Sequence, residues 1–245
     1  MTRTLQQIGW LVLKDLRIES RTRQTLGLVV VLGILIVTVL GLSLQPGQIT
    51  PPLQSASAQS DNSSLVSRPS TGVSATSILW VAYLFAGVLC FEKTMAYERL
   101  DGALMGLLLA PLDRGAIYLA KLCSNLVLMF AVAAIITPVG ILFFNFDLSR
   151  GIAGFLAIMS LSMVGFAAVG TLFAAVVSSS RLQGGLLAMV VFPLTLPLVV
   201  ASTHLMSRMY ESGVSPHGSA FAVLLAFDAI FLVVSWLAFE WVLEP

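Results

Sequence analysis

Charged side chains are scarce in this sequence: Asp, Glu, Lys and Arg make up 10% of its 245 residues, against about 25% in an ordinary soluble domain. Hydrophobic residues make up 58% of the chain, and its mean hydropathy is +0.96. A soluble protein of this length needs more polar surface than this composition supplies. The scarcity of charge therefore excludes a soluble globular domain and predicts a protein that lies in a lipid bilayer.

The sequence also lacks the residue patterns of an enzyme. It contains neither the H-E-x-x-H pattern of metalloproteases nor the G-x-S-x-G pattern of hydrolases. The phosphate-binding pattern G-x-x-x-x-G-K-[ST] is absent as well, so we expect ATP hydrolysis, if the system uses it, on a separate partner chain. There are only two histidines, and no group of carboxylates falls inside a hydrophobic segment. We therefore expect no catalytic residue, no metal, no bound cofactor and no nucleic-acid partner.

Long hydrophobic runs, in contrast, are abundant. A helix needs about 20 apolar residues to cross the hydrocarbon core, and lipid offers no hydrogen-bonding partner to an open backbone. The runs are unbroken and do not alternate, which argues against a β-barrel. The sequence predicts an all-α transmembrane domain over residues 25–245. Its six transmembrane helices are expected at about 25–44, 74–91, 117–144, 151–177, 186–205 and 219–242.

Lysines and arginines are distributed unevenly between the two sides that six transmembrane helices create. Ten fall on the side of the N-terminus and three on the other, the three being Arg68, Arg150 and Arg208. Because cytoplasmic loops carry the excess of positive charge, we predict a multi-pass protein of the bacterial inner membrane with both termini in the cytoplasm. Cys90 and Cys123 then lie near the reducing side, where no disulfide is expected.

The first 24 residues form a segment that precedes the membrane spans. In a helix, four apolar residues share one face: Leu5, Ile8, Val12 and Leu16. Three cations lie on the opposite side: Lys14, Arg17 and Arg21. We predict an amphipathic helix over residues 1–24 that lies in the membrane interface with its cations towards anionic headgroups. A plain topology anchor without a docking role is the alternative.

Residues 92–116, between the second and third spans, combine a charged stretch with a short apolar one. The apolar run Ala103–Ala110 would rise only about 12 Å as a helix, far too little to cross a bilayer. We predict a short cytoplasmic coupling helix whose apolar patch binds a partner protein; packing against the chain's own bundle is the alternative. The candidate coupling residues are Glu98, Arg99, Asp101, Gly102, Leu104, Leu108 and Pro111.

Three polar residues within or beside the spans are further candidates. Asp228 falls near the middle of the sixth span, so it should face protein or water, either as a structural hydrogen-bonding group or with a role in transport. His204 lies at the outer end of the fifth span and is a candidate haem ligand, because His and Met are the usual axial ligands of haem iron. Lys121, near the start of the third span, is expected to extend its side chain to the interface.

Small residues recur once per turn in the fourth span, at Ala167, Thr171, Ala175 and Ser179. Such a stripe lets another helix approach closely. The sequence leaves open whether that helix belongs to the same chain or to a second copy of it.

Three stretches carry a resemblance to known transporters. The first is K-D-L-R-I-E at 14–19, the second is D-G at 101–102 with Leu108, Pro111 and A-K at 120–121, and the third is F-P-L-T-L-P-L at 192–198. The run Y-E-R-L-D-G-A-L at 97–104 resembles the loop after the second span in ABC-2 type permeases. The chain as a whole resembles the haem exporter protein B family of cytochrome c maturation (CcmB).

The resemblance implies a permease subunit that pairs with a separate cytoplasmic ABC ATPase and with other membrane proteins of cytochrome c maturation. It further implies that haem is the transported substrate and that ATP binds to the partner ATPase. A second copy of the chain is a further partner to consider. The residues 105–106 are Met and Gly, where many ABC-2 permeases carry a glutamate. Two other functions stay open: an assembly scaffold of the same complex that moves no haem itself, and an ABC-2 exporter of another substrate.

Overall fold

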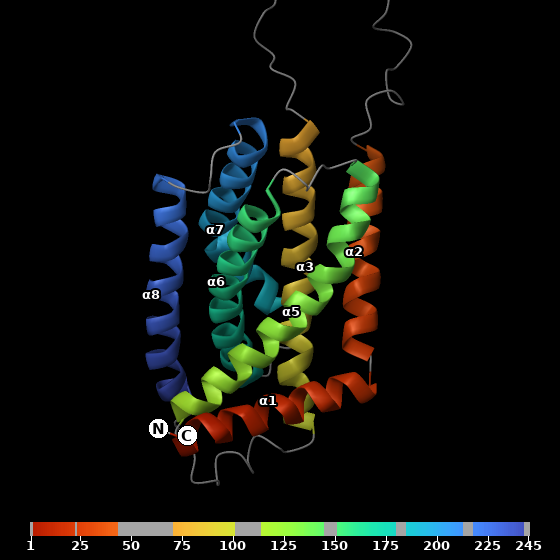
Figure 1. Ribbon diagram of the computed structural model, residues 1–245. Helices are drawn as coiled ribbons and strands as arrows, with labels where there is room; N and C mark the ends of the chain where they lie inside the picture. Colours follow the sequence, from red (N-terminus) through yellow and green to blue (C-terminus); the bar gives the residue numbers. More distant parts are fainter. Residues whose placement is uncertain are drawn as a thin grey trace, which may run out of the picture.

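The computed structural model describes residues 2–22, 24–43, 71–100, 114–144, 151–179, 185–212 and 218–242 (Figure 1). The regular elements in these ranges are all helices and none is a strand, which confirms the predicted all-α class for the described part of the chain. The helices are α1 Thr2–Thr22, α2 Gln24–Ser43, α3 Thr71–Leu100, α5 Arg114–Phe144, α6 Ile152–Ser179, α7 Leu186–Ser212 and α8 Ser219–Val242.

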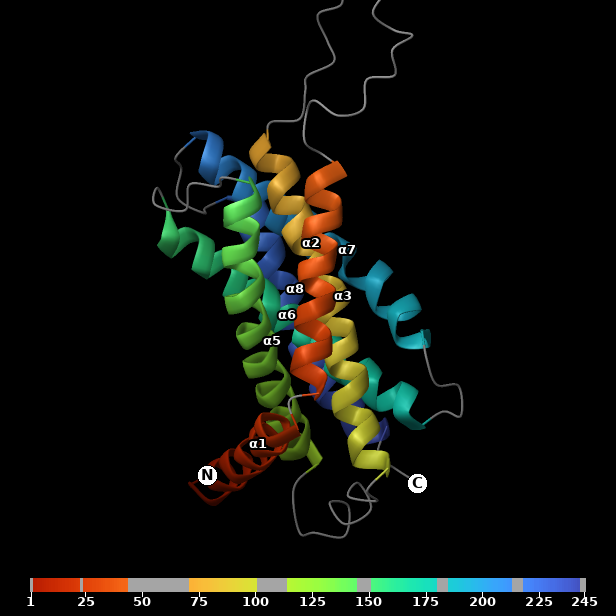
Figure 2. The ribbon, with the colours of Figure 1, turned by 90° about the vertical axis from the view of Figure 1, so that its right-hand side faces the viewer.

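Six of these helices are long and apolar enough to cross a membrane, as the sequence predicted: α2, α3, α5, α6, α7 and α8. They run side by side and alternate in direction, while α1 lies across one end of them (Figure 1). We call this end the α1 end. The helices α2 and α5 begin there, α3, α6 and α8 end there, and α7 begins further from that end, nearer the middle of the bundle (Figure 2).

The helices α3, α5 and α6 pack against one another and form the centre of the bundle. In the membrane-spanning part of α3, 61% of the residues are buried, against 28% in α2 and 22% in α8. The exposed positions of these outer helices carry large apolar side chains, such as Val31, Leu42 and Ile230. Water would penalise such a surface, whereas lipid solvates it, so these faces are those of a protein immersed in a bilayer.

Glycines and aromatic rings join α3 to α6. The ring of Phe91 in α3 lies over Gly170 of α6, and the ring of Phe166 in α6 lies over Gly87 of α3. The two rings meet edge to face with their centroids 5.2 Å apart. The absence of a side chain at each glycine leaves the space that the opposite ring fills.

The predicted stripe of small residues is also part of this packing. Ala167, Thr171 and Ala175 are 0%, 0% and 7% exposed, and Thr171 accepts a 3.0 Å hydrogen bond from the amide of Asn125 in α5. The close approach that the stripe permits therefore occurs within this chain.

Candidate coupling site at the α1 end

The predicted coupling residues fall at the end of α3 and in the connection from α3 to α5. Glu98 and Arg99 lie in the last turn of α3, and α5 begins at Arg114, both at the α1 end (Figure 1). The remaining candidates, and with them the predicted coupling helix, lie outside the described residues: Asp101, Gly102, Leu104, Leu108 and Pro111. The structure thus describes α3 and α5, the two helices that precede and follow residues 101–113 in the chain.

A buried ion pair fastens α1 to α5 at the same end. The Nζ atom of Lys121 lies 2.7 Å from Oδ2 of Asp15, and the hydroxyl of Ser124 donates to the same oxygen at 3.3 Å. The side chains of Lys121 and Asp15 are 4% and 10% exposed. The sequence predicted that Lys121 extends its side chain to the interface. Its ammonium group ends on α1, the helix across the end of the bundle, where Asp15 neutralises it away from solvent.

A second acidic residue of α1 holds the start of α2. Glu19 is 7% exposed, and its Oε1 atom accepts a 2.9 Å hydrogen bond from the backbone N–H of Leu26. The first N–H groups of a helix have no partner within the helix, and a negative charge at this end is favourable because of the helix dipole. Glu19 thus caps α2, so α1 is attached to two membrane-spanning helices.

The two acids explain how α1 is oriented. Asp15 and Glu19 are four residues apart and share a face with Ile8 and Val12, which are partly buried. Trp10, on the other side of the helix, is 74% exposed. Figure 2 shows α1 beside the first turns of α5, and the two helices pack together. The apolar face predicted for this helix is therefore turned towards the bundle.

Sequence reasoning missed the role of this pair of acids. The available signal was their position: two carboxylates one turn apart on the apolar face of an amphipathic helix require a buried partner. The sequence did not identify that partner, which comes from another helix 106 residues further along the chain.

Asp228 lies in the interior of the bundle. It is 4% exposed, and neither carboxylate oxygen has a hydrogen-bond partner among the described residues. A Cβ atom added to Gly165 of α6 would lie 3.2 Å from Cγ of Asp228 and 2.7 Å from Cδ1 of Leu198 in α7. The carboxyl group therefore occupies the space that a side chain at position 165 would otherwise fill, between three helices.

Replacing Asp228 by Asn should leave insertion and assembly largely intact, because the amide has the same shape and carries no charge. Replacement by Lys should lower the amount of assembled protein, since a charge at mid-membrane costs about 2.5–3.5 kcal/mol and the longer chain does not fit beside Gly165. Asp228→Leu is the matched control for volume without charge. Size-exclusion profiles of the solubilised variants measure the amount of assembled protein. An Asp228→Lys variant that assembles normally would contradict the buried placement of Asp228.

His204 lies alone on the surface of α7. Its side chain is exposed, whereas Met206 and Met209 are 1% and 8% exposed, so the structure does not bring these three side chains to one surface. In the described ranges, no group of three or more His, Cys, Asp and Glu residues could hold a metal ion. Haem ligation by His204 remains a prediction from the sequence.

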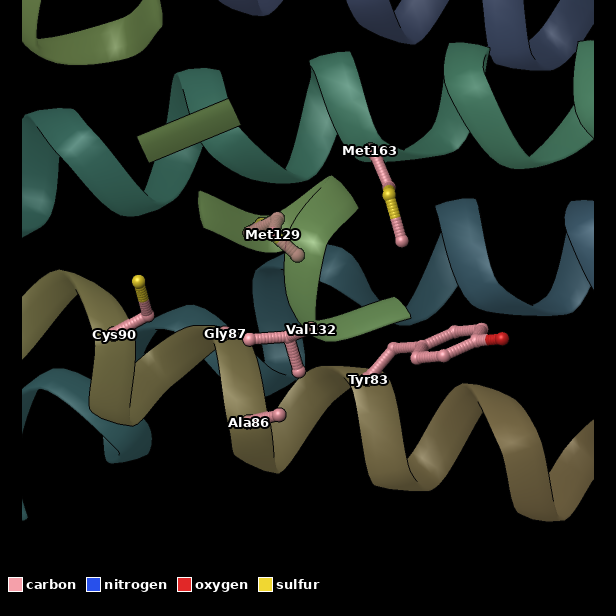
Figure 3. Close-up of a pocket in the computed structure, with 7 residues that line it drawn as sticks. All are labelled: Tyr83, Ala86, Gly87, Cys90, Met129, Val132 and Met163. Atoms are coloured by element: carbon pink, nitrogen blue, oxygen red, sulfur yellow. The ribbon is translucent and has the colours of Figure 1, made fainter. Parts of the chain in front are cut away.

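A small cavity lies between α3, α5 and α6 (Figure 3). Its volume is about 10 Å³, which is about the space of one water molecule. It is far too small for a haem group in this conformation. The residues that line it are Tyr83, Ala86, Gly87, Cys90, Met129, Val132 and Met163.

Six membrane-spanning helices with an amphipathic helix across one end define a multi-pass helical membrane protein. The model of one protein family, described as CcmB protein, matches residues 70–244. The chain belongs to the CcmB family, the family of the membrane component of the haem exporter in cytochrome c maturation. The resemblance found in the sequence is thereby confirmed. No curated protein matches the chain.

The family match begins where α3 begins and extends through α8. The helices α1 and α2, which carry Asp15, Glu19 and Leu26, precede the matched residues. The attachment of α1 to α5 therefore joins a segment outside the match to one inside it.

Proposed function

We propose that this chain is the permease subunit of an ABC-type haem exporter, and that it couples ATP hydrolysis on a separate cytoplasmic chain to haem export or to the release of a haem-loaded chaperone. The family match over residues 70–244 carries the proposal. The sequence supports the separate ATPase, because it has no phosphate-binding loop. The other membrane proteins of cytochrome c maturation are the remaining partners.

The arrangement of the helices supports a docking face for the proposed ATPase at the α1 end. The end of α3 and the start of α5 lie at the α1 end, so the 101–113 segment between them is anchored there at both of its ends. Most lysines and arginines of the sequence belong to this side, and the rule of positive charge in cytoplasmic loops assigns it to the cytoplasm. We therefore assign the α1 end to the face on which a cytoplasmic ATPase docks.

Single cysteines at Ser57 and Arg181, in a background without Cys90 and Cys123, should react from opposite sides with an impermeant thiol reagent. The segment that contains Ser57 connects α2 to α3, and the segment that contains Arg181 connects α6 to α7. Intact cells should be labelled at position 57 and should be labelled at position 181 only after permeabilisation. Labelling of both positions from the same side would contradict the assigned topology.

Reconstitution tests the function itself. The chain, the partner ATPase and the other membrane subunits are placed in proteoliposomes, and ATP-dependent haem transfer and release of the haem chaperone are followed together. We expect at least one of them to require ATP and this chain, and a complete complex that shows neither would contradict the proposal. Chaperone release without haem crossing the membrane would support the scaffold alternative.

A further inference from the structure

We propose that Asp15 and Lys121 are a positioning pair that makes α1 and the first turns of α5 one rigid unit, through which movement of the start of α5 reaches α2. The inference rests on the proposed function, because it concerns how movement imposed by the ATPase spreads through the chain. It assigns a role to α1 that neither its amphipathic pattern nor the family match gives.

The path begins at the start of α5, at Arg114, which follows in sequence the residues proposed to bind the ATPase. Lys121 follows seven residues later, about 10 Å along the helix, so a displacement of the start of α5 displaces Lys121 with it. The ion pair passes the displacement to Asp15, and Glu19, one turn further along α1, passes it to the first turn of α2 through Leu26.

The burial of the pair explains why it acts as a rigid connection. An exposed ion pair exchanges readily with water and contributes little. Asp15 also lies 3.7 Å from Nζ of Lys14, but Lys14 is 40% exposed and belongs to α1 itself, so the buried contact with Lys121 is the one that fixes α1 to α5. Lys121 and Ser124 both contact the same oxygen of Asp15, so two positions of α5 hold one carboxylate. A slide of α1 along α5 would break these contacts.

Two distances test whether the unit is rigid. Spin labels at Leu13 and Leu119, which are 57% and 39% exposed, report on α1 against α5. Labels at Leu119 and Met189, the latter 77% exposed, report on α5 against α7. In the complete complex, in a background free of Cys90 and Cys123, we expect ATP binding to change the second distance and leave the first unchanged.

A change in the first distance as large as that in the second would overturn the inference and leave the proposed function standing. If neither distance responds to ATP in the complete complex, the proposed coupling itself fails and takes the inference with it. The two failures are therefore distinguished by the Leu119–Met189 pair.

The role of the pair is tested by a ratio: the number of ATP molecules hydrolysed for each haem transferred or each chaperone released. We expect Lys121→Ala and the milder Asp15→Asn to raise this ratio about fivefold or more, with the assembled complex still able to hydrolyse ATP. The exchange Asp15→Lys with Lys121→Asp should restore it towards the wild-type value, and Arg17→Gln, on the exposed face of α1, should leave it unchanged. A purely structural pair would lower the amount of complex without changing the ratio. Assembled Asp15→Asn complexes with a wild-type ratio would overturn the proposal even where Lys121→Ala fails to assemble.

Discussion

Replacing Leu104 and Leu108 together by Asp is expected to abolish co-purification of the partner ATPase while the chain still inserts into the membrane. The two leucines are four residues apart, the spacing of apolar anchors when a helix docks in a groove. Burying an unpaired carboxylate in such a groove costs roughly 2–3 kcal/mol or more for each residue. Since about 1.4 kcal/mol corresponds to a factor of ten in affinity, the double variant should bind at least about a thousandfold more weakly.

A matched control separates the loss of a docking surface from the addition of charge. Gly106→Asp with Ala110→Asp introduces the same two carboxylates into the same segment, but on the other side of the predicted helix. The control should retain the ATPase. If the Leu104 and Leu108 double variant binds as the wild type does and retains ATP-dependent activity, this segment is not the coupling site.

The transmembrane helices were predictable because their cause is local. A run of about 20 apolar residues has few alternatives to a membrane-spanning helix, and this property can be read without knowing any neighbour. The helix over residues 2–22 was predictable for a similar reason, since its apolar residues recur with helical spacing. The family could also be recognised, because its motifs are short stretches of sequence.

The neighbours of the buried polar residues were not predictable. Lys121 was expected to reach the interface because the sequence gives its depth in the span but not its partner. Asp15 approaches it only because α1 folds back across the bundle end, a tertiary arrangement that periodicity does not specify. For Asp228 the sequence indicated burial, but the neighbouring space exists because Gly165 happens to face it. The proposed ATPase contact stays a prediction, since most of its residues lie outside the described ranges.

The contact between Gly170 and Phe91 belongs to the same class of long-range features, and it carries the second large expected effect. A Cβ atom at position 170 would approach the Cζ atom of Phe91 to 2.8 Å, closer than side chains tolerate. Phe91 is 0% exposed and its ring is held against Phe166, so it has no free space to move into. Gly170→Val should therefore lower the stability of the solubilised protein by about 1–3 kcal/mol, the usual cost of overpacking.

Gly27→Val is the matched control, because Gly27 is also helical and has nothing within 4 Å of the position a Cβ would take. Gly27→Val should unfold at the wild-type temperature, and Gly170→Val should unfold at a lower temperature. Adding Phe91→Leu to Gly170→Val should recover part of the loss, since a smaller side chain frees the space that valine needs, and such non-additivity identifies residues in contact. If Gly170→Val behaves as Gly27→Val does, α3 and α6 are not packed as closely as described.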